Sequence, residues 1–201
     1  MNIKVDISNV VLKTQRLTLR SFRYEDLDDF YDYAKVEGVG ELAGWKHHQN
    51  KEETLKILEM FINNKNVFAI EINNHVYGSF GLEKYNKEDE LTEFSNYYGI
   101  ELGFVLAKQF WGQGIIKEAC DAVIDYLFNV VNIDFILCCH FERNNQSKRV
   151  QEKCGFIPYR KLIFDTSYNT KEPSIMNLLL NPKKDIKLEY SHQETLILNK
   201  Y

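Results

Sequence analysis

Hydrophobic and polar positions repeat with two different periods along this chain, and each change of period marks a new element. Alternation at every second residue, or a short apolar run, predicts strands at 10–20, 67–72, 76–85, 97–107 and 134–141. Apolar residues three or four positions apart predict helices at 24–34, 51–63, 118–131 and 147–154. Two further apolar stretches predict a final hairpin, at 162–168 and 174–180.

This order of elements predicts an α+β sandwich around one mixed, mostly antiparallel sheet. Residues 86–95 are polar and acidic, which indicates a surface loop. No repeat or linker divides the chain before Pro182, so we expect residues 1–184 to form a single domain. Residues 185–201 are expected to be a C-terminal tail or an added strand.

Composition and charge narrow the class of protein. The 201 residues are 44% hydrophobic and 27% charged, as in globular proteins, and the formal net charge of −4 argues against nucleic acid as a partner. No apolar stretch approaches the roughly 20 residues of a membrane span. The four cysteines lack zinc-site spacing, so we expect no metal and reduced thiols in a cytoplasmic protein.

A glycine turn separates the strand at 97–107 from the helix that follows it. Gly112 and Gly114 lie one residue apart at this step. Glycine tolerates positive φ and leaves its N–H group uncovered, and the start of a helix favours negative charge. The turn therefore predicts an anion site, with an ordinary tight turn as the alternative.

Three motifs occur in order on the expected elements: Gln109-x-x-Gly112-x-Gly114, Asn144-x-x-Ser147, and the run Glu152–Phe156. Together they resemble the GNAT superfamily of acetyl-CoA-dependent N-acetyltransferases. The Trp111–Gly114 run and the Asn-x-x-Ser pattern look like the Rim-type branch, which acetylates the N-termini of ribosomal proteins. The resemblance implies a GNAT-like α/β/α sandwich with splayed fourth and fifth strands.

The resemblance also implies a place for acetyl-CoA as co-substrate, in the cleft between the splayed strands. Strand backbone would bind the pantetheine amides, the glycine turn would bind the pyrophosphate, and the Asn-x-x-Ser loop would contact the pantetheine and the sulfur. The candidate cofactor-binding residues are Phe104, Val105, Leu106, Gln109, Trp111, Gly112, Gln113, Gly114, Ile115, Asn144 and Ser147.

The implied reaction is direct attack of a primary amine on the thioester in a ternary complex. Glu101 is the candidate general base, with a solvent-facing strand-end carboxylate as the alternative. Ser147 is the candidate contact or acid for the sulfur, and capping of the following helix is its alternative role. Gln151 occupies the place where many family members carry the tyrosine that protonates the thiolate, which leaves the acid open.

Candidate acceptor-binding residues are Trp45, Glu83, Tyr85 and His140. The expected function is N-acetyltransfer to an amine acceptor, with a protein N-terminus as one such acceptor. A small amine (an antibiotic, a polyamine or an amino acid) is the alternative substrate, and an acyl-CoA sensor without turnover is the alternative class. The sequence is compatible with a monomer or a homodimer.

Overall fold

The computed structural model describes residues 1–85 and 91–187 of the chain. Its strands form one mixed sheet in the order β1-β2-β3-β4-β5-β6-β8-β7. The strands are β1 Leu12–Lys13, β2 Thr18–Ser21, β3 Val67–Ile72, β4 His75–Glu83, β5 Gly99–Leu106, β6 Phe135–Phe141, β7 Ile157–Asp165 and β8 Lys171–Leu180. The α-helices are α1 Leu27–Ala34, α2 Lys51–Asn64, α3 Ile115–Tyr126 and α4 Asn145–Lys153.

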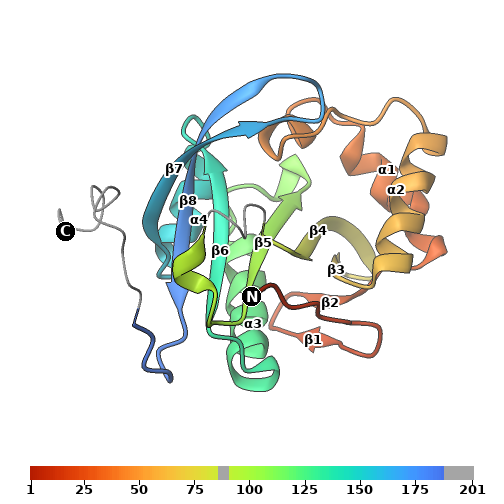
Figure 1. Ribbon diagram of the computed structural model, residues 1–201. Coiled ribbons are helices and arrows are strands. Elements are labelled where there is room, and N and C mark those ends of the chain that lie inside the picture. Colours follow the sequence, from red (N-terminus) through yellow and green to blue (C-terminus); the bar gives the residue numbers. More distant parts are fainter. Residues whose placement is uncertain (86–90, 188–201) are drawn as a thin grey trace.

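Helices cover both faces of the sheet, as the α/β/α prediction requires. Successive side chains of a strand point to opposite faces. In β3, Phe68 and Ile70 pack in the cluster that contains α3, whereas Val67 and Ala69 pack in the cluster that contains α1 and α2. Figure 1 shows α1 and α2 side by side at the β3–β4 end of the sheet, away from β7 and β8. The predicted fold class is confirmed.

The predicted strand at 10–20 is instead a short hairpin. β1 and β2 pair antiparallel, and the Thr14 N–H donates to the Leu17 carbonyl at 3.0 Å to close the turn between them. The Thr14 hydroxyl supports the turn by accepting from the Leu17 N–H at 2.9 Å. Alternation continues through the turn, so the pattern alone hides it. The splayed pair therefore consists of β5 and β6 rather than the fourth and fifth strands.

The parallel neighbours β5 and β6 separate halfway along their length. They pair from Gly99↔Phe135 to Leu102↔Cys138, and the described pairing ends there. β5 continues to pair with β4 as far as Leu106, while β6 continues to pair with β8 as far as Phe141. The expected splay is thus present, at the carboxyl ends of two parallel strands.

The predicted surface loop at 86–95 is wrong in its second half, while residues 86–90 lie outside the described residues. Leu91 and Phe94 are fully buried, and the Phe94 ring stacks on Phe135 with centroids 4.2 Å apart. They belong to a third apolar cluster on the sheet. Two apolar residues in an acidic run were sufficient to anchor the segment.

The helix predicted at 118–131 begins earlier and changes its winding. α3 starts at Ile115, directly after the glycine turn. From Leu127 to Val131 the chain forms a π-helical turn, which contains more residues per turn than an α-helix. Val130, expected on the apolar face, is therefore rotated into solvent and is 70% exposed. No helix in the described part of the chain is long and apolar enough to cross a membrane.

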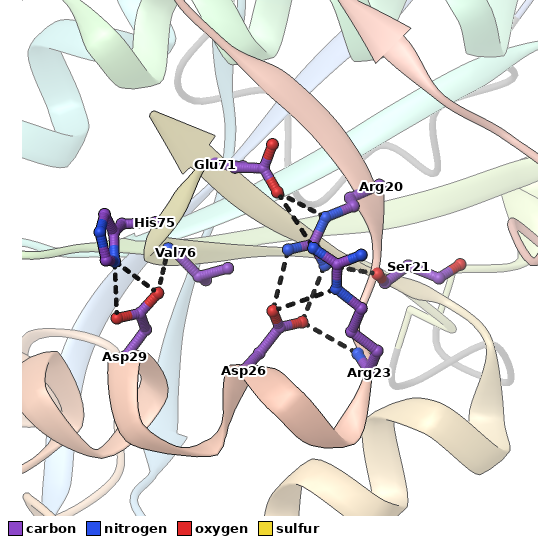
Figure 2. Close-up of polar contacts among 8 residues, drawn as sticks. All are labelled: Arg20, Ser21, Arg23, Asp26, Asp29, Glu71, His75 and Val76. Atoms are coloured by element: carbon purple, nitrogen blue, oxygen red, sulfur yellow. Dashed lines mark hydrogen bonds and ion pairs between the residues drawn. The ribbon is translucent and has the colours of Figure 1, made fainter. Parts of the chain in front are cut away.

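A buried ion-pair network fastens the start of α1 to β2 and β3 (Figure 2). The Arg20 guanidinium donates to both carboxylate oxygens of Asp26 at 2.8 Å and to Glu71 at 2.7 Å. Asp26 also accepts from the Arg23 N–H at 2.9 Å. Bidentate charge-assisted bonds of this kind are strong, and removing one partner leaves a buried charge uncompensated.

Asp26→Ala should lower the free energy of unfolding by about 3 kcal/mol, because Arg20 would remain buried with half of its partners gone. Asp28→Ala is the matched control: Asp28 bonds Lys51 at 2.7 Å, but its side chain is 76% exposed against 5% for Asp26. We expect the control to unfold close to the wild-type urea midpoint, since exposed pairs contribute little. Equal losses in both variants would show that burial does not strengthen this network.

Candidate active site

A cavity of about 650 Å³ lies where β5 and β6 separate. The second half of β5, the end of β6, the glycine turn and the first turns of α3 and α4 border it. The loop between α1 and α2 contributes Val39, Leu42 and Ala43. The cavity therefore joins segments that are far apart in the sequence, at the carboxyl ends of the parallel strands.

The cavity reaches both faces of the sheet through the splay. Leu102 and Cys138 pack on the α3 side, so their neighbours Glu101 and Cys139 point to the α1–α2 side. Glu83 of β4 lies directly opposite Glu101 and shares its face. These side chains line the cavity from one face, and Ser147 and His140 line it from the other. A group held on the α4 side can thus meet carboxylates on the opposite side.

The glycine turn has the geometry of an anion cradle. Gly112 and Gly114 both have φ of +76°, in the left-handed region that favours glycine, and both line the cavity. A Cβ at Gly112 would find no atom within 4 Å, so the space in front of it is open to a ligand. No side chain caps the start of α3 at Gly114. The N–H groups of that first turn remain available, since a helix leaves them without internal partners.

Three basic residues line the cavity on the two helices that start beside it: Lys117 on α3, and Arg149 and Lys153 on α4. The Lys117 ammonium is held by Asp121 at 2.6 Å, and this bond raises the pKa of Lys117. Positive charge beside an uncapped helix start fits a polyanionic group such as a pyrophosphate. The residues present therefore suit the phosphates of a coenzyme A thioester.

The free edge of β5 faces the cavity at Phe104 and Val105. An extended ligand can add to such an edge through backbone hydrogen bonds. At Leu106 the carbonyl oxygen already accepts from the Trp111 indole Nε1 at 2.7 Å. Trp111 thus ties the glycine turn to the strand, and Leu106 offers less to a ligand than its two predecessors.

The carboxylate side of the cavity is partly desolvated. Although the Glu83 residue is exposed overall, partial burial raises the pKa of its carboxyl group, and a hydrogen bond from Asn66 Nδ2 at 3.0 Å counteracts this. Burial raises the pKa of the Cys139 thiol, and the negative charge of Glu101 acts in the same direction. Glu101 therefore lies beside Cys139 in the wall of the cavity.

Asn144, not Ser147, caps α4. The Asn144 Oδ1 accepts from the Ser147 N–H at 3.1 Å, and its Nδ2 donates to the Leu42 carbonyl at 3.2 Å. These bonds leave one hydrogen and one oxygen lone pair of the amide for a ligand, and Asn144 lines the cavity, so its contact with the pantetheine stays a prediction. The Ser147 hydroxyl is released from capping by Asn144 and lines the cavity.

The segment Gly38–Trp45, here called the strap, contributes Val39, Leu42 and Ala43 to the cavity, whereas the sequence analysis named only its Trp45. The Ser167 N–H donates to the Gly44 carbonyl at 2.8 Å, and Arg143 donates to the Glu41 carbonyl at 3.3 Å. In Figure 1 the β7–β8 loop arches toward this segment. The strap is therefore held beside the cavity by residues more than a hundred positions away in sequence.

Four predicted site residues do not line the cavity. Trp45 packs on His48 and on the apolar cluster under α1 and α2, and Tyr85 is buried against Phe135. Gln109 and Gln113 are exposed and bond each other through Gln113 Nε2 and the Gln109 carbonyl at 2.7 Å. The loop between the first two helices suggested Trp45, the strand of Glu83 suggested Tyr85, and the glycine motif suggested the two glutamines, but none of the four borders the cavity.

Fold and site together define an acyltransferase-like architecture, a splayed α+β sheet with an anion cradle at the splay. The family model of the acetyltransferase (GNAT) domain matches residues 16–157, and the chain belongs to the GNAT acetyltransferase family. Members of this family use acetyl-CoA.

Individual relatives agree with this family. "Putative ribosomal N-acetyltransferase YdaF" of Bacillus subtilis (strain 168) is 37% identical over 57 residues, 28% of this chain and only 31% of that protein's length. The structure of an acetyltransferase (GNAT family) from Bacillus anthracis aligns with a TM-score of 0.73 at 19% identity, covering 86% of this chain and 99% of that one. Microcin C7 self immunity acetyltransferase MccE, solved in complex with acetyl-CoA and AMP, aligns with a TM-score of 0.66 at 13% identity, over 83% and 93% of the two chains.

Proposed function

We propose that this protein transfers the acetyl group of acetyl-CoA to a primary amine. The observation that carries the proposal is the cavity itself, which connects the uncapped start of α3 to the carboxylates Glu83 and Glu101 through the splay. The cradle would hold the pyrophosphate, and the edge at Phe104 and Val105 would hold the pantetheine amides. Acetyl-CoA supplies an activated acetyl group as a thioester.

Each face of the sheet then has its own chemical task. An amine that enters from the α1–α2 face forms the new C–N bond, and Glu101 accepts the proton that the amine nitrogen loses, directly or through water. As the C–S bond breaks, Ser147 is placed on the α4 face to donate a hydrogen bond or proton to the sulfur. Holding both substrates in one cavity supplies much of the rate enhancement.

The acceptor proposed here is a cationic amine. Glu83 and Glu101 place two carboxylates on the acceptor side, which would attract an ammonium and favour its entry. A protein N-terminal amine is the first candidate, because a relative is named as a ribosomal N-acetyltransferase. A small amine is the second candidate, because the strap residues Val39, Leu42 and Ala43 border the cavity and reduce the room for a peptide.

Release of free thiol from acetyl-CoA tests the proposal. The amine panel comprises short peptides with free N-termini, the same peptides N-acetylated, polyamines and amino acids. We expect thiol release matched by acetylated product with one class of free amine and none with the blocked peptides. Calorimetric binding of acetyl-CoA without thiol release for any amine would instead identify a sensor.

A further inference from the structure

Four polar side chains form a continuous hydrogen-bonded chain along the α4 side of the cavity. Gln151 Nε2 donates to the Ser147 Oγ at 3.0 Å, and Asn177 Nδ2 donates to Gln151 Oε1 at 2.7 Å. Asn177 Nδ2 also contacts His140 Nδ1 at 2.9 Å. Gln151, Asn177 and His140 are buried, whereas Ser147 is half-buried. The two ends of the chain, Ser147 and His140, line the cavity.

Backbone carbonyls fix the direction of this chain, because a carbonyl oxygen can only accept. Gln151 Nε2 lies 3.2 Å from the Cys139 carbonyl, so the NH₂ group of this amide must be on that side. Asn177 Nδ2 lies 3.3 Å from the carbonyls of both Cys138 and Ile175, which sets its orientation in the same way. The orientation of both amides therefore follows from their surroundings.

This direction determines which protons reach the cavity. The Asn177 NH₂ group has two hydrogens, and its two shortest contacts are Gln151 Oε1 at 2.7 Å and His140 Nδ1 at 2.9 Å. We assign the hydrogens to these two, so His140 Nδ1 accepts and the proton of a neutral ring is on Nε2. Burial lowers the pKa of His140, and the Gln151 side chain counteracts this shift without cancelling it. At the other end, the Ser147 Oγ accepts from Gln151. Its own hydrogen has no acceptor within the described residues and remains free to donate.

We propose that Gln151 and Asn177 are positioning residues that hold Ser147 and His140 as two hydrogen-bond donors toward the cavity. Only the target of these two donors depends on the proposed function: it is the sulfur or the carbonyl oxygen of the thioester. Gln151 cannot protonate a thiolate as a tyrosine would. It instead orients the neighbouring serine to do so, one helical turn away on the same face of α4.

The ring proton of His140 gives a readout that needs no turnover. Nitrogen-15 NMR of the wild-type protein at neutral pH, with the signal assigned by its loss in His140→Gln, should show a neutral ring protonated on Nε2. A neutral ring protonated on Nδ1 would overturn the proposal. The charged residues around this ring are Lys148 and Glu152 on α4 and Glu142 after β6, so the pH titration is recorded at two salt concentrations.

Asn177→Asp reverses the direction of the hydrogen bond to His140, because a carboxylate can only accept a hydrogen bond, here from Nδ1–H of the ring. We expect the proton to move to Nδ1, or the ring to become charged. We also expect kcat to fall about a hundredfold to a thousandfold, as for the loss of one donor at a reacting oxygen, with the KM for acetyl-CoA little changed. The activity that remains should decline as pH rises and the charged ring loses its Nε2 proton. An unchanged ring tautomer in Asn177→Asp would overturn the proposal.

Asn181→Asp is the matched control, since Asn181 is a buried amide at the end of β8 outside the cavity. It should keep the wild-type pH profile. Gln151→Glu tests the serine end: its carboxylate takes the hydrogen of Ser147, so its kcat should fall about as far as that of Ser147→Ala. Wild-type kcat in Gln151→Glu would refute that half of the proposal. If the wild type releases no thiol with any amine, the proposed function fails while the ring measurement stands.

Discussion

Gly112→Trp is expected to weaken the binding of acetyl-CoA by more than about a hundredfold, or about 2.8 kcal/mol, while the domain remains folded. Gly112 is exposed, lines the cavity and has open space where a side chain would begin. An indole there would occupy the space proposed for the pyrophosphate and cover the uncapped N–H groups of α3. Calorimetry with acetyl-CoA measures the affinity, and circular dichroism reports the fold.

Gly155→Trp is the control that separates the effect of backbone strain from the effect of filling the proposed pyrophosphate site. Gly155 has φ of +86°, close to the +76° of Gly112, and is also exposed, but it lies after α4 and does not line the cavity. Both variants force tryptophan into the left-handed region and therefore share the cost of that conformation. We expect Gly155→Trp to bind acetyl-CoA normally. If Gly112→Trp also binds it normally, the assignment of the pyrophosphate to this turn is wrong.

Local patterns were sufficient for the framework of the fold. Strand and helix periods located β3 to β6, β8 and α1 to α4 within a few residues, because each element buries one regular face. The strand predicted at 162–168 is displaced, since β7 begins five residues earlier, at Ile157, and ends at Asp165. The predictions fail where the local hydrophobic pattern and the tertiary packing favour different structures. The hairpin at Thr14–Leu17 preserves the alternation that predicts one strand, and the acidic run before Phe94 hides an anchor that only the packing on Phe135 reveals.

The candidate site likewise contains residues that sequence motifs predicted and residues that only the tertiary structure brings together. The glycine turn and the Asn-x-x-Ser loop are contiguous in sequence, so their place at the cavity followed from the motifs. The strap and the Gln151–Asn177 amide pair depend on contacts between residues 26 to more than 100 positions apart, which no local pattern encodes. From the sequence, Gln151 was only the residue at the place of a missing tyrosine, yet its side chain makes three hydrogen bonds, with Cys139, Ser147 and Asn177.

Ser147 shows how the structure can decide between two roles that the sequence left open. The sequence suggested Ser147 as the contact or acid for the sulfur, with capping of α4 as its alternative role. The Asn144 side chain caps α4 instead, and the serine hydroxyl lines the cavity. The hydroxyl is therefore available as the donor that the proposed reaction needs.

Glu101→Gln is expected to lower kcat about a hundredfold, since general base catalysis typically contributes 10²–10⁴-fold. The substitution preserves shape and removes only the ability to accept a proton, so the affinity for acetyl-CoA should remain. Steady-state rates are measured across the pH range with the best amine of the panel. In the wild type a carboxylate base makes the rate fall at low pH, and this fall should be absent from the pH–rate profile of Glu101→Gln. An unchanged pH–rate profile would remove Glu101 from the mechanism.

Two matched variants make the result for Glu101 specific. Glu83→Gln removes the carboxylate directly across from Glu101 on the same face, and should chiefly raise the KM of a cationic amine because one attracting charge is lost. Glu59→Gln alters an exposed glutamate of α2 that does not line the cavity, and should leave kcat and KM unchanged. If Glu83→Gln lowers kcat as far as Glu101→Gln does, the carboxylates act as one unit, and the proton leaves the amine through the pair.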